Sequence, residues 1–406
     1  MQSASTSQLP VDARRGVTAR RIAGAVVDEL HLLARPSDPA AGVAAQAASA
    51  YGSLVAVLKA QGAGPESLVI ENVFLRPLAS DYHAVAAERA RAFGSAGFQP
   101  DGPASTFIGQ APLEGDGACL EVAAVALLPR GPGATFLPAV HAAASCTCPA
   151  CAAGFRGRLV RLGSQTQLHA GNVFGRGGDA VAEAFDMFVE AEKLLAAAGM
   201  DFGDVLRTWI HLRDIDRDYA ALNQARRDFF AARGIERRPA STGVQGIPFA
   251  ADHDFSLSLF AVKSARPLDV PLMSTPALNE AWTYGADFSR GLRLVDDNKV
   301  SLLVSGTASI DERGLSVHDG DLAAQVERML HNIETLLEEQ GAGFADLVSA
   351  VTYVKRAGDA PLVARLLAAR GFGGFPLAVV EAPLCRPELL CETEAVAVLP
   401  LTAGAR

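Results

Sequence analysis

The chain has 406 residues, of which 50% are hydrophobic and 20% are charged, and its formal net charge is −9. This length accommodates two or three domains, each with its own core. The negative charge argues against a general nucleic-acid or membrane-surface binder, although local arginines would still allow an anionic small substrate.

Targeting and redox signals are weak. No apolar run approaches the roughly 18–20 residues that span a bilayer, and the N-terminus lacks the apolar segment of a secretory signal, so we expect residues 1–14 to form a flexible tail. The six cysteines are not spaced like a disulfide framework. We therefore expect a cytoplasmic protein with reduced thiols.

The same order of elements occurs three times along the chain. In each copy a β-rich stretch leads to a long helix with apolar residues at three-and-four spacing, closed by a glycine suited to the left-handed C-cap. A strand, a second helix, a proline-containing turn and a final strand follow. The long helices are expected within Ala40–Gly64, Gly178–Gly199 and Gly320–Gly343, and the next strands within Ser67–Leu78, Asp204–Ile215 and Asp346–Ala357.

The spacing of the turn prolines indicates a repeat of whole domains. Pro103, Pro239 and Pro376 are separated by 239 − 103 = 136 and 376 − 239 = 137 residues, a period too large for a solenoid unit. The predicted units span residues 15–130, 157–265 and 278–402. Residues 131–156 form an Ala-, Gly- and Cys-rich linker with little periodicity between the first two units.

This order predicts an α+β fold for each unit. A β-β-α-β-α-β succession gives one mixed sheet with both helices on one face. The other sheet face also carries apolar residues and needs a cover. Three such sheets facing one another would supply it, so we expect a pseudo-threefold trimer within a single chain.

The motifs of the third unit resemble those of a known family. GDLAAQ (from Gly320), NIETLL (from Asn332), GAG (from Gly341), DLVSAVTYV (from Asp346) and ETEAVAV (from Glu392) are similar to the YjgF/YER057c/UK114, or Rid, family. The resemblance covers nearly the whole chain three times over. It implies Rid-like (chorismate-mutase-like) units with active sites between them, and many members hydrolyse enamines or imines.

One position departs from the Rid pattern. The family's substrate-carboxylate arginine would stand two residues after the turn proline, where this chain has Ser105, Ser241 and Ala378. Loss of that anchor argues against ordinary imine hydrolysis, because the anchor fixes the substrate.

The second half of the chain has a narrower resemblance. FSRG (from Phe288), SGTASIDERGLSVHDGD (from Ser305), RTW (from Arg207) and LCRPELLCETE (from Leu384) are similar to the chorismatases, fused Rid-like enzymes that release pyruvate from chorismate. That resemblance would place the catalytic acid on Glu392. It would also place an arginine of the site on Arg386, and the cysteine of the hydroxybenzoate-forming branch on Cys385.

Glu392 is also favoured by its own position in the chain. It opens a strand that alternates with Val396 and Val398, so its carboxyl can be held rigidly and partly buried. Burial raises a carboxyl pKa, and protonating an enol ether requires an acid that is neutral near pH 7. The alternative is a solvated surface glutamate. Glu394 lies on the same face, and we expect one of the two to face a pocket.

The repeats predict equivalent positions in the other two units, of which only one keeps an acid. Glu121 of the first unit aligns with Glu392, whereas the second unit has Ser256 at that position. We therefore interpret the pocket of Glu392 as active and that of Glu121 as vestigial.

The substrate-binding candidates are arginines and hydroxyls. Guanidinium groups match carboxylate geometry, which makes Arg386, Arg290 and Arg207 candidates, although arginines are also common at solvated surfaces. Ser305 and Thr307 share one face with Ser309 and could contact a substrate or end a strand.

The linker contains the one metal-like cluster of the sequence, His141, Cys146, Cys148 and Cys151. Zinc requires four such ligands, and Cys148 with Cys151 supplies a CxxC element. A second such element is absent, so we favour a mobile linker with incidental thiols over a metal site.

Three hypotheses about the function remain open. The favoured one is a cofactor-free, chorismatase-like enzyme of secondary metabolism that protonates the enol ether of chorismate or a related unsaturated acid. The alternatives are a Rid-type imine or enamine hydrolase and a non-catalytic binding module. In each case the expected partner is a small anionic molecule rather than nucleic acid or membrane, and the chain would be a monomeric pseudo-trimer or a low-order homo-oligomer.

Overall fold

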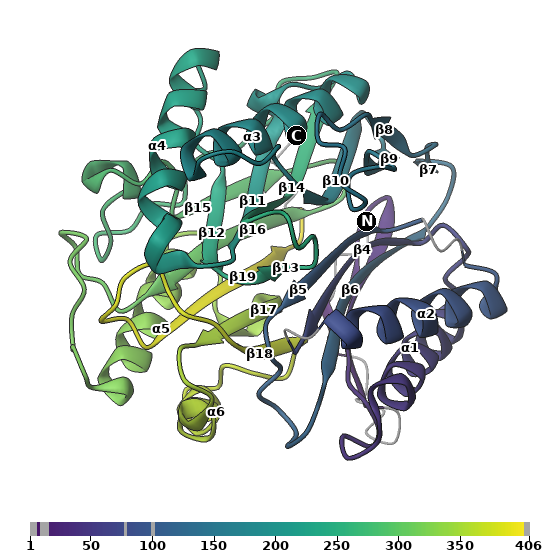
Figure 1. Ribbon diagram of the computed structural model, residues 1–406, viewed down its shortest axis with the longest axis horizontal. Helices are drawn as coiled ribbons and strands as arrows, with labels where there is room; N and C mark the ends of the chain where they lie inside the picture. The colour runs from purple at the N-terminus through teal and green to yellow at the C-terminus, as the bar shows by residue number, and fades with distance from the viewer. Residues whose placement is uncertain (1–5, 9–15, 77–78, 99–101, 402–406) are drawn as a thin grey trace.

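The computed structural model describes residues 6–8, 16–76, 79–98 and 102–401. It contains three mixed sheets with helices packed on them (Figure 1). The α+β fold and the three repeated units predicted from the sequence are thereby confirmed. Most of the predicted tail, residues 1–14, lies outside the described residues, except for β1 (Thr6–Gln8), which pairs with β2.

The first sheet is built from the N-terminal third of the chain, with β13 (Ile247–Pro248) of the second unit added at its edge. Its order is β1-β2-β3-β6-β4-β5-β13, and helices α1 and α2 pack on it. The elements are β2 (Val17–Ala23), β3 (Val27–Ala34), α1 (Val43–Ala60), β4 (Leu68–Leu75), α2 (Ala79–Ala96), β5 (Ala104–Gly109) and β6 (Leu120–Pro129).

The second sheet repeats this plan with order β12-β11-β14-β10-β9-β7. Its unit comprises β9 (Phe155–Leu162), β10 (Gln165–Val173), α3 (Ala180–Ala197), β11 (Val205–Leu212), α4 (Ile215–Arg233), β12 (Ala240–Gln245) and β14 (Phe255–Ser264), besides β13, which pairs in the first sheet. The linker is more ordered than its composition indicated, because β7 (Ala134–Phe136) and β8 (Val140–Ala142) both pair with β9.

The third sheet has order β15-β16-β19-β17-β18. Its elements are β15 (Gly291–Val295), β16 (Val300–Ala308), α5 (Leu322–Glu338), β17 (Leu347–Val354), α6 (Ala360–Ala369), β18 (Leu377–Glu381) and β19 (Cys391–Leu399). In each unit the proline turn leads into a short strand parallel to its predecessor, so the observed order is β-β-α-β-α-β-β. The extra strand, absent from the prediction, forms because the apolar residues after the proline add to the edge of β4, β11 or β17.

The repeat holds at the level of single residues. The central antiparallel pair of each sheet carries a register shift at the same place, after Leu68 in β4, Val205 in β11 and Leu347 in β17. The same pairs align three equivalent couples: Phe74 with Glu121, His211 with Ser256, and Tyr353 with Glu392. This register confirms the equivalence of Glu121, Ser256 and Glu392 inferred from sequence.

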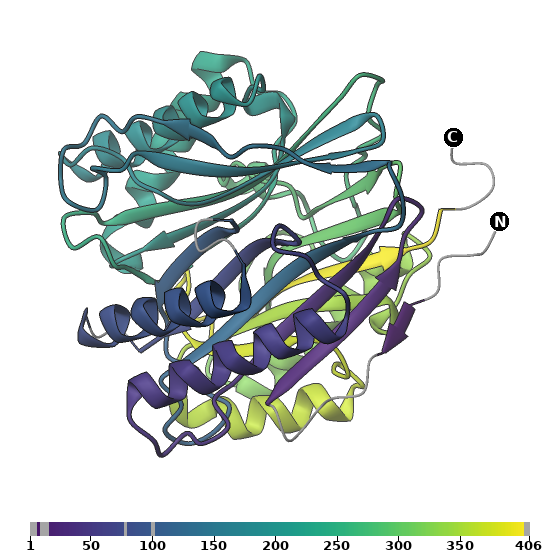
Figure 2. The same ribbon diagram turned by 90° about the vertical axis from the view of Figure 1, so that its right-hand side faces the viewer.

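The three sheets face inward, and the helices lie on their outer sides (Figure 2). Neighbouring units also exchange backbone contacts. β13 of the second unit pairs with β5 of the first, Ala240 bridges to Ser289, and Pro112 bridges to Val380. The interior is therefore closed by the chain itself, as the pseudo-threefold arrangement requires.

Among the described helices, α1 alone has the length and apolarity of a membrane span. Its buried residues, including Tyr51, Leu54 and Leu58, belong to the core of the first sheet. Core helices pass the same test, so this is weak evidence for a span.

Candidate active site

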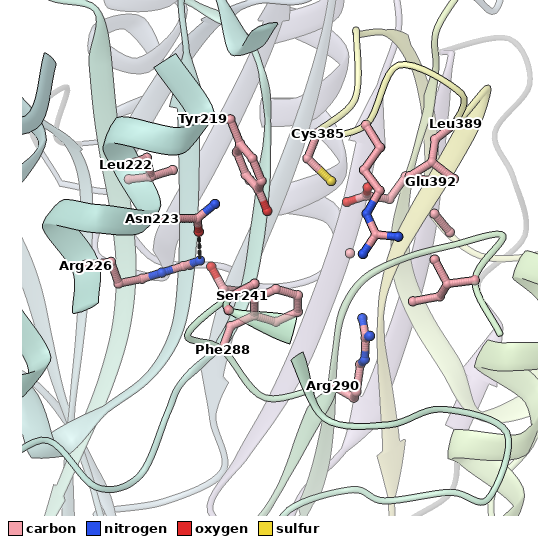
Figure 3. Close-up of a pocket in the computed structure, with 17 residues that line it drawn as sticks. Tyr219, Leu222, Asn223, Arg226, Ser241, Phe288, Arg290, Cys385, Leu389 and Glu392 are labelled. Atoms are coloured by element: carbon pink, nitrogen blue, oxygen red, sulfur yellow. Dashed lines mark hydrogen bonds between the residues drawn. The ribbon is translucent and has the colours of Figure 1, made fainter. Parts of the chain in front are cut away.

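A cavity of about 200 Å³, here called the Glu392 cavity, lies where the second and third units meet (Figure 3). Helix α4 and strand β12 line it from the second unit, and β16 with the segment before β19 lines it from the third. Its polar side chains are Tyr219, Asn223, Arg226, Ser241, Arg290, Cys385, Arg386 and Glu392. Glu392 and Arg386 thus share one cavity, which a merely solvated Glu392 would not do.

Glu392 stands near the start of β19, opposite Ala308 and Tyr353, and is 5% exposed. Burial raises the pKa of its carboxyl to about 8, and Glu394 adds to the rise while Arg290, Arg207 and Arg386 oppose it. Desolvation dominates because a buried carboxylate loses hydration that the arginines only partly replace. The group is therefore a neutral acid at pH 7, as the sequence argument required.

A glycine makes room for this carboxyl. A Cβ atom on Gly306 would lie 2.0 Å from Glu392 Oε1 and 3.3 Å from Thr242 Cγ2. The Gly306 N–H also donates to Thr242 Oγ1 across the unit boundary, at 3.0 Å. Any side chain at this position would displace the acid, so the glycine is a requirement of the site.

Two of the predicted arginines are held in place at the cavity. Arg290 Nε donates to the carbonyl of Asn279 at 2.9 Å, and its guanidinium lies 5.6 Å from the centre of the Phe288 ring. Arg386 Nη1 donates to the carbonyl of Gly314 at 2.8 Å and to Ser316 Oγ at 3.1 Å. These contacts fix the orientation of the guanidinium groups, which suits recognition of carboxylates.

A third arginine was missed by the sequence reasoning. Arg226 of α4 lines the cavity and donates to Asn223 Oδ1 at 2.7 Å. The repeat could have indicated it, because Arg89 stands 137 residues earlier and donates to Ser105 Oγ at 3.0 Å. Ser105 and Ser241 occupy the position where the Rid pattern has its arginine, so α2 and α4 bring guanidinium groups to the same region by another route.

Cys385 also faces the cavity, opposite Tyr219 in Figure 3. Burial, with the proximity of Glu392, raises the pKa of its thiol to about 12, although Arg386 and a hydrogen bond with Tyr219 lower it. The side chain is consequently a neutral thiol at pH 7, and the thiolate that nucleophilic catalysis needs is absent.

Arg207 lies elsewhere. Its guanidinium is 3% exposed and donates to Glu394 Oε2 at 2.8 Å and to Thr242 Oγ1 at 2.6 Å. Trp209 Nε1 donates to the other oxygen of Glu394 at 2.8 Å. Arg207, Trp209 and Glu394 line a second cavity of about 170 Å³ between the sheets. The carboxylate that Arg207 binds is therefore one of the protein's own.

The hydroxyls of the SGTAS stretch also point away from the Glu392 cavity. Ser305 Oγ donates to the carbonyl of Ser289 at 2.6 Å and accepts from the Ser241 N–H at 2.9 Å, while Thr307 Oγ1 donates to the carbonyl of Ser305. Gly306, Ala308 and Ile310, on the alternate face, line the cavity instead. Ser305 thus joins the two units, Thr307 bonds within its own strand, and neither lines the cavity.

The position equivalent to Glu392 in the first unit is closed by an ion pair. Glu121 is fully buried and accepts from Arg35 Nε at 3.0 Å, and burial raises the pKa of its carboxyl to about 7 against the opposing effect of Arg35. Ala34 pairs with Val122, so the next step of this register sets Arg35 opposite Glu121. The third unit has Ala308 at the corresponding place, which leaves the space that forms the Glu392 cavity.

The cysteines of the linker do come together. Cys146, Cys148 and Cys151 lie with His253, and their four ligand atoms are within 4.8 Å of one another. His253 lies in the loop between β13 and β14, far from the linker in the chain, and the sequence pattern did not indicate it as a ligand. His141, the histidine predicted from the sequence as a candidate fourth ligand, lies on the exposed side of β8.

The charges of the Glu392 cavity define what it can bind. Arg226, Arg290 and Arg386 line it, and Glu392 is the one acid among its described lining residues. With that acid neutral, the cavity carries a positive charge that suits a small molecule with two carboxylates. The same molecule would lie beside a proton donor of raised pKa, the arrangement used in general acid catalysis.

Comparison with known proteins agrees with this geometry. Residues 286–399 match the family described as Endoribonuclease L-PSP. The chain is 26% identical over 221 residues to a 3-hydroxybenzoate synthase of Streptomyces hygroscopicus and 29% identical over 226 residues to a chorismatase of Streptomyces rapamycinicus. Each match covers 48% of this chain, and the chain spans 64% and 65% of these relatives, under two thirds of their length.

The fold is shared over a longer range. A crystal structure of a chorismatase superposes with a TM-score of 0.62 and 16% identity, covering 92% of this chain and 99% of the other. At this identity the likeness concerns the fold. The third unit is therefore similar to the endoribonuclease L-PSP family, and the chain as a whole has the fold of that chorismatase structure.

Proposed function

We propose that this protein is a chorismatase-like enzyme that releases pyruvate from chorismate or a related unsaturated acid. The observation that carries the proposal is Glu392, a buried carboxyl with a pKa of about 8 in a cavity lined by three arginines. The similarity to relatives named chorismatase and 3-hydroxybenzoate synthase supports the choice of substrate class.

The proposed reaction begins with proton transfer. The Glu392 carboxyl gives its proton to the methylene carbon of the enolpyruvyl ether, which becomes a methyl group, and the adjacent carbon becomes an oxocarbenium ion. Water, or a hydroxyl of the substrate, then attacks that carbon. With water, collapse of the adduct breaks the bond to the ring oxygen and yields pyruvate and an alcohol. One proton of the attacking water returns to Glu392 and the other passes to the departing ring oxygen, so atoms and charge balance.

The arginines would orient the substrate rather than react. Arg290 and Arg386, each held by backbone carbonyls, would bind carboxylates as oriented donors. Arg226 enters from the other unit, so it would bind the opposite end of the molecule. Positioning of this kind can contribute several kcal/mol to lowering a barrier.

Cys385 would act as a neutral group beside the acid. Its thiol lines the cavity and has a raised pKa, so it can donate a hydrogen bond or restrict the attacking group, but it does not supply a thiolate.

The Glu121 position would be inactive. Arg35 occupies the space next to Glu121 and also pairs with Glu114 at 2.5 Å. A substrate carboxylate would have to displace two protein carboxylates from Arg35. We therefore propose one working site per chain, with the Glu121 position as its vestigial counterpart.

The test is incubation of the purified chain with chorismate while pyruvate is followed through lactate dehydrogenase. We expect release by the wild type and by Glu66→Gln, an exposed glutamate, and none by Glu392→Gln. Absence of pyruvate from folded wild-type protein would reject the proposal and return attention to imines. Release that survives in Glu392→Gln would reject this residue as the acid.

A further inference from the structure

We propose that Cys146, Cys148, Cys151 and His253 bind one zinc ion, which fastens the linker between the first two units to the second unit. The cluster lies outside the Glu392 cavity and has no part in the proposed reaction. It unites residues from two loops that are more than 100 positions apart in the chain, since His253 stands 107, 105 and 102 residues after the three cysteines.

The spacing of the ligand atoms suits zinc. His253 Nε2 lies 3.7, 3.2 and 3.4 Å from the sulfurs of Cys146, Cys148 and Cys151. In a tetrahedral site with Zn–S of about 2.3 Å and Zn–N of about 2.0–2.1 Å, the nitrogen-to-sulfur distance is about 3.5 Å. The nitrogen thus lies at about the required distance from each sulfur, and the four atoms are within 4.8 Å of one another.

The histidine is oriented as a ligand. Its ring is 1% exposed and stacks on Phe174, with centroids 5.0 Å apart and an angle of 15° between the planes. The second ring nitrogen, Nδ1, faces Glu183 Oε1 at 3.8 Å. Metal-bound histidines usually direct their other nitrogen toward a carboxylate or carbonyl, which fixes the ring and raises its basicity.

Glu183 itself is firmly placed. Its Oε1 accepts from the N–H groups of Asp254 at 2.7 Å and Phe255 at 3.3 Å. The loop before β14 is held further by Arg213, whose Nη2 donates to the carbonyls of Ala250 at 3.1 Å and His253 at 2.8 Å. The histidine side of the site is therefore built by contacts that do not depend on a metal.

The cysteine loop is also preorganised. The Cys148 N–H donates to Cys146 Sγ at 3.4 Å, and the Cys151 N–H donates to the carbonyl of Cys148 at 3.0 Å. Gly154, with φ of +69°, turns the chain where a Cβ atom would lie 2.4 Å from the Ala142 carbonyl oxygen. Ser145, next to the first cysteine, is held by Glu190 and Lys193 of α3.

A site with four protein ligands has a structural role. Catalytic zinc sites keep a position open for water or substrate, whereas closed sites with cysteine and histidine ligands stabilise a fold. Here the ion would join the linker to the loop between β13 and β14. The second unit supplies α4 and β12 to the Glu392 cavity, so we expect the metal to support that wall without touching the substrate.

The first experiment is elemental analysis of the full chain, purified without a histidine tag from zinc-supplemented culture. We expect one zinc ion per chain in the wild type and loss of zinc in Cys148→Ser and in His253→Ala. His141→Ala and Cys119→Ser are matched controls that should retain the ion, since neither residue belongs to the cluster.

A second measurement on the wild type keeps the proposal testable if the variants fold poorly. Wild-type protein stripped of metal and loaded with Co²⁺ should show the visible bands of tetrahedral cobalt with thiolate ligands, and zinc should abolish them. Chelation should also expose residues 143–154 to limited proteolysis. Wild-type protein that takes up neither zinc nor cobalt with all its thiols reduced, or that holds a disulfide within the cluster, would overturn the proposal, as would equal zinc in Cys148→Ser.

Discussion

Replacement of Glu392 by glutamine tests the buried neutral acid directly. Burial raises the pKa of this carboxyl from 4.5 to about 8. Between these two values the folded chain holds a proton that the unfolded chain has released. The contribution of this carboxyl to the free energy of unfolding is therefore fully present below pH 4.5. It decreases by about 1.4 kcal/mol per pH unit from there to pH 8. Glutamine is neutral at every pH and nearly the same shape, so the variant lacks this dependence.

The magnitude follows from the width of the window. From pH 5.5 to pH 7.5, both inside it, the free energy of unfolding of the wild type should fall by about 3 kcal/mol relative to Glu392→Gln. All other titrating groups are common to the two proteins and cancel in the difference. The variant should consequently be the more stable protein at neutral pH, and the two should converge below pH 4.5.

The assay is urea denaturation followed by the fluorescence of the two tryptophans, at several pH values, with the same series for the exposed control Glu66→Gln. Infrared spectra add an independent reading, since a protonated carboxyl band present at pH 7 in the wild type should be missing from Glu392→Gln. Parallel stability profiles of wild type and Glu392→Gln from pH 5.5 to 7.5 would refute the reasoning, because they would mean that Glu392 is ionised in the folded state.

Three further predictions concern the same region. The rate of pyruvate release should fall as the pH rises through about 8, because the proton donor is then lost; a profile that stays flat across this range in kcat/KM would exclude Glu392 as the acid. Gly306→Ala should lower kcat by about 100-fold, the usual effect of misplacing a catalytic group by about 1 Å, since its Cβ would meet the Glu392 carboxyl. Gly52→Ala, with nothing within 4 Å of its Cβ, should keep wild-type activity and gain about 1 kcal/mol of stability, because Gly52 lies within helix α1. Glu394→Gln should destabilise the fold by about 3–5 kcal/mol in urea denaturation, because it leaves the buried Arg207 guanidinium without its carboxylate. The double variant Arg207→Met/Glu394→Gln should recover much of this loss. Equal stability of Glu394→Gln and wild type would contradict the pairing.

The sequence by itself determined the architecture and the equivalence of Glu121, Ser256 and Glu392. Three apolar-periodic helices, three strands and three prolines recur at nearly constant spacing, and such periodicity arises from local geometry that each segment carries alone. The same repeat aligned Glu121, Ser256 and Glu392, and the strand registers reproduce that alignment. Local pattern was enough because each of these features belongs to a single unit.

The tertiary structure alone decided which side chains meet. Alternation placed Ser305 and Thr307 on one face of β16 but could not tell which face lines the cavity, since a register shift between Val304 and Thr307 interrupts the pairing of that strand. Arg207 was recognised as a buried strand arginine, yet its partner Glu394 lies 187 residues away on another unit. No local period encodes how two units dock.

The same limit explains the missed residues. Arg226 reaches the Glu392 cavity from the second unit, and His253 reaches the linker cysteines from a loop more than 100 residues later. The sequence shows that Arg35 and Ala308 differ, but it does not show how that difference changes the space beside the equivalent glutamates. Only the paired strands show that one residue fills the space beside Glu121 while the other leaves the space beside Glu392 open. A site between units is fixed by their packing, which is a property of the whole fold.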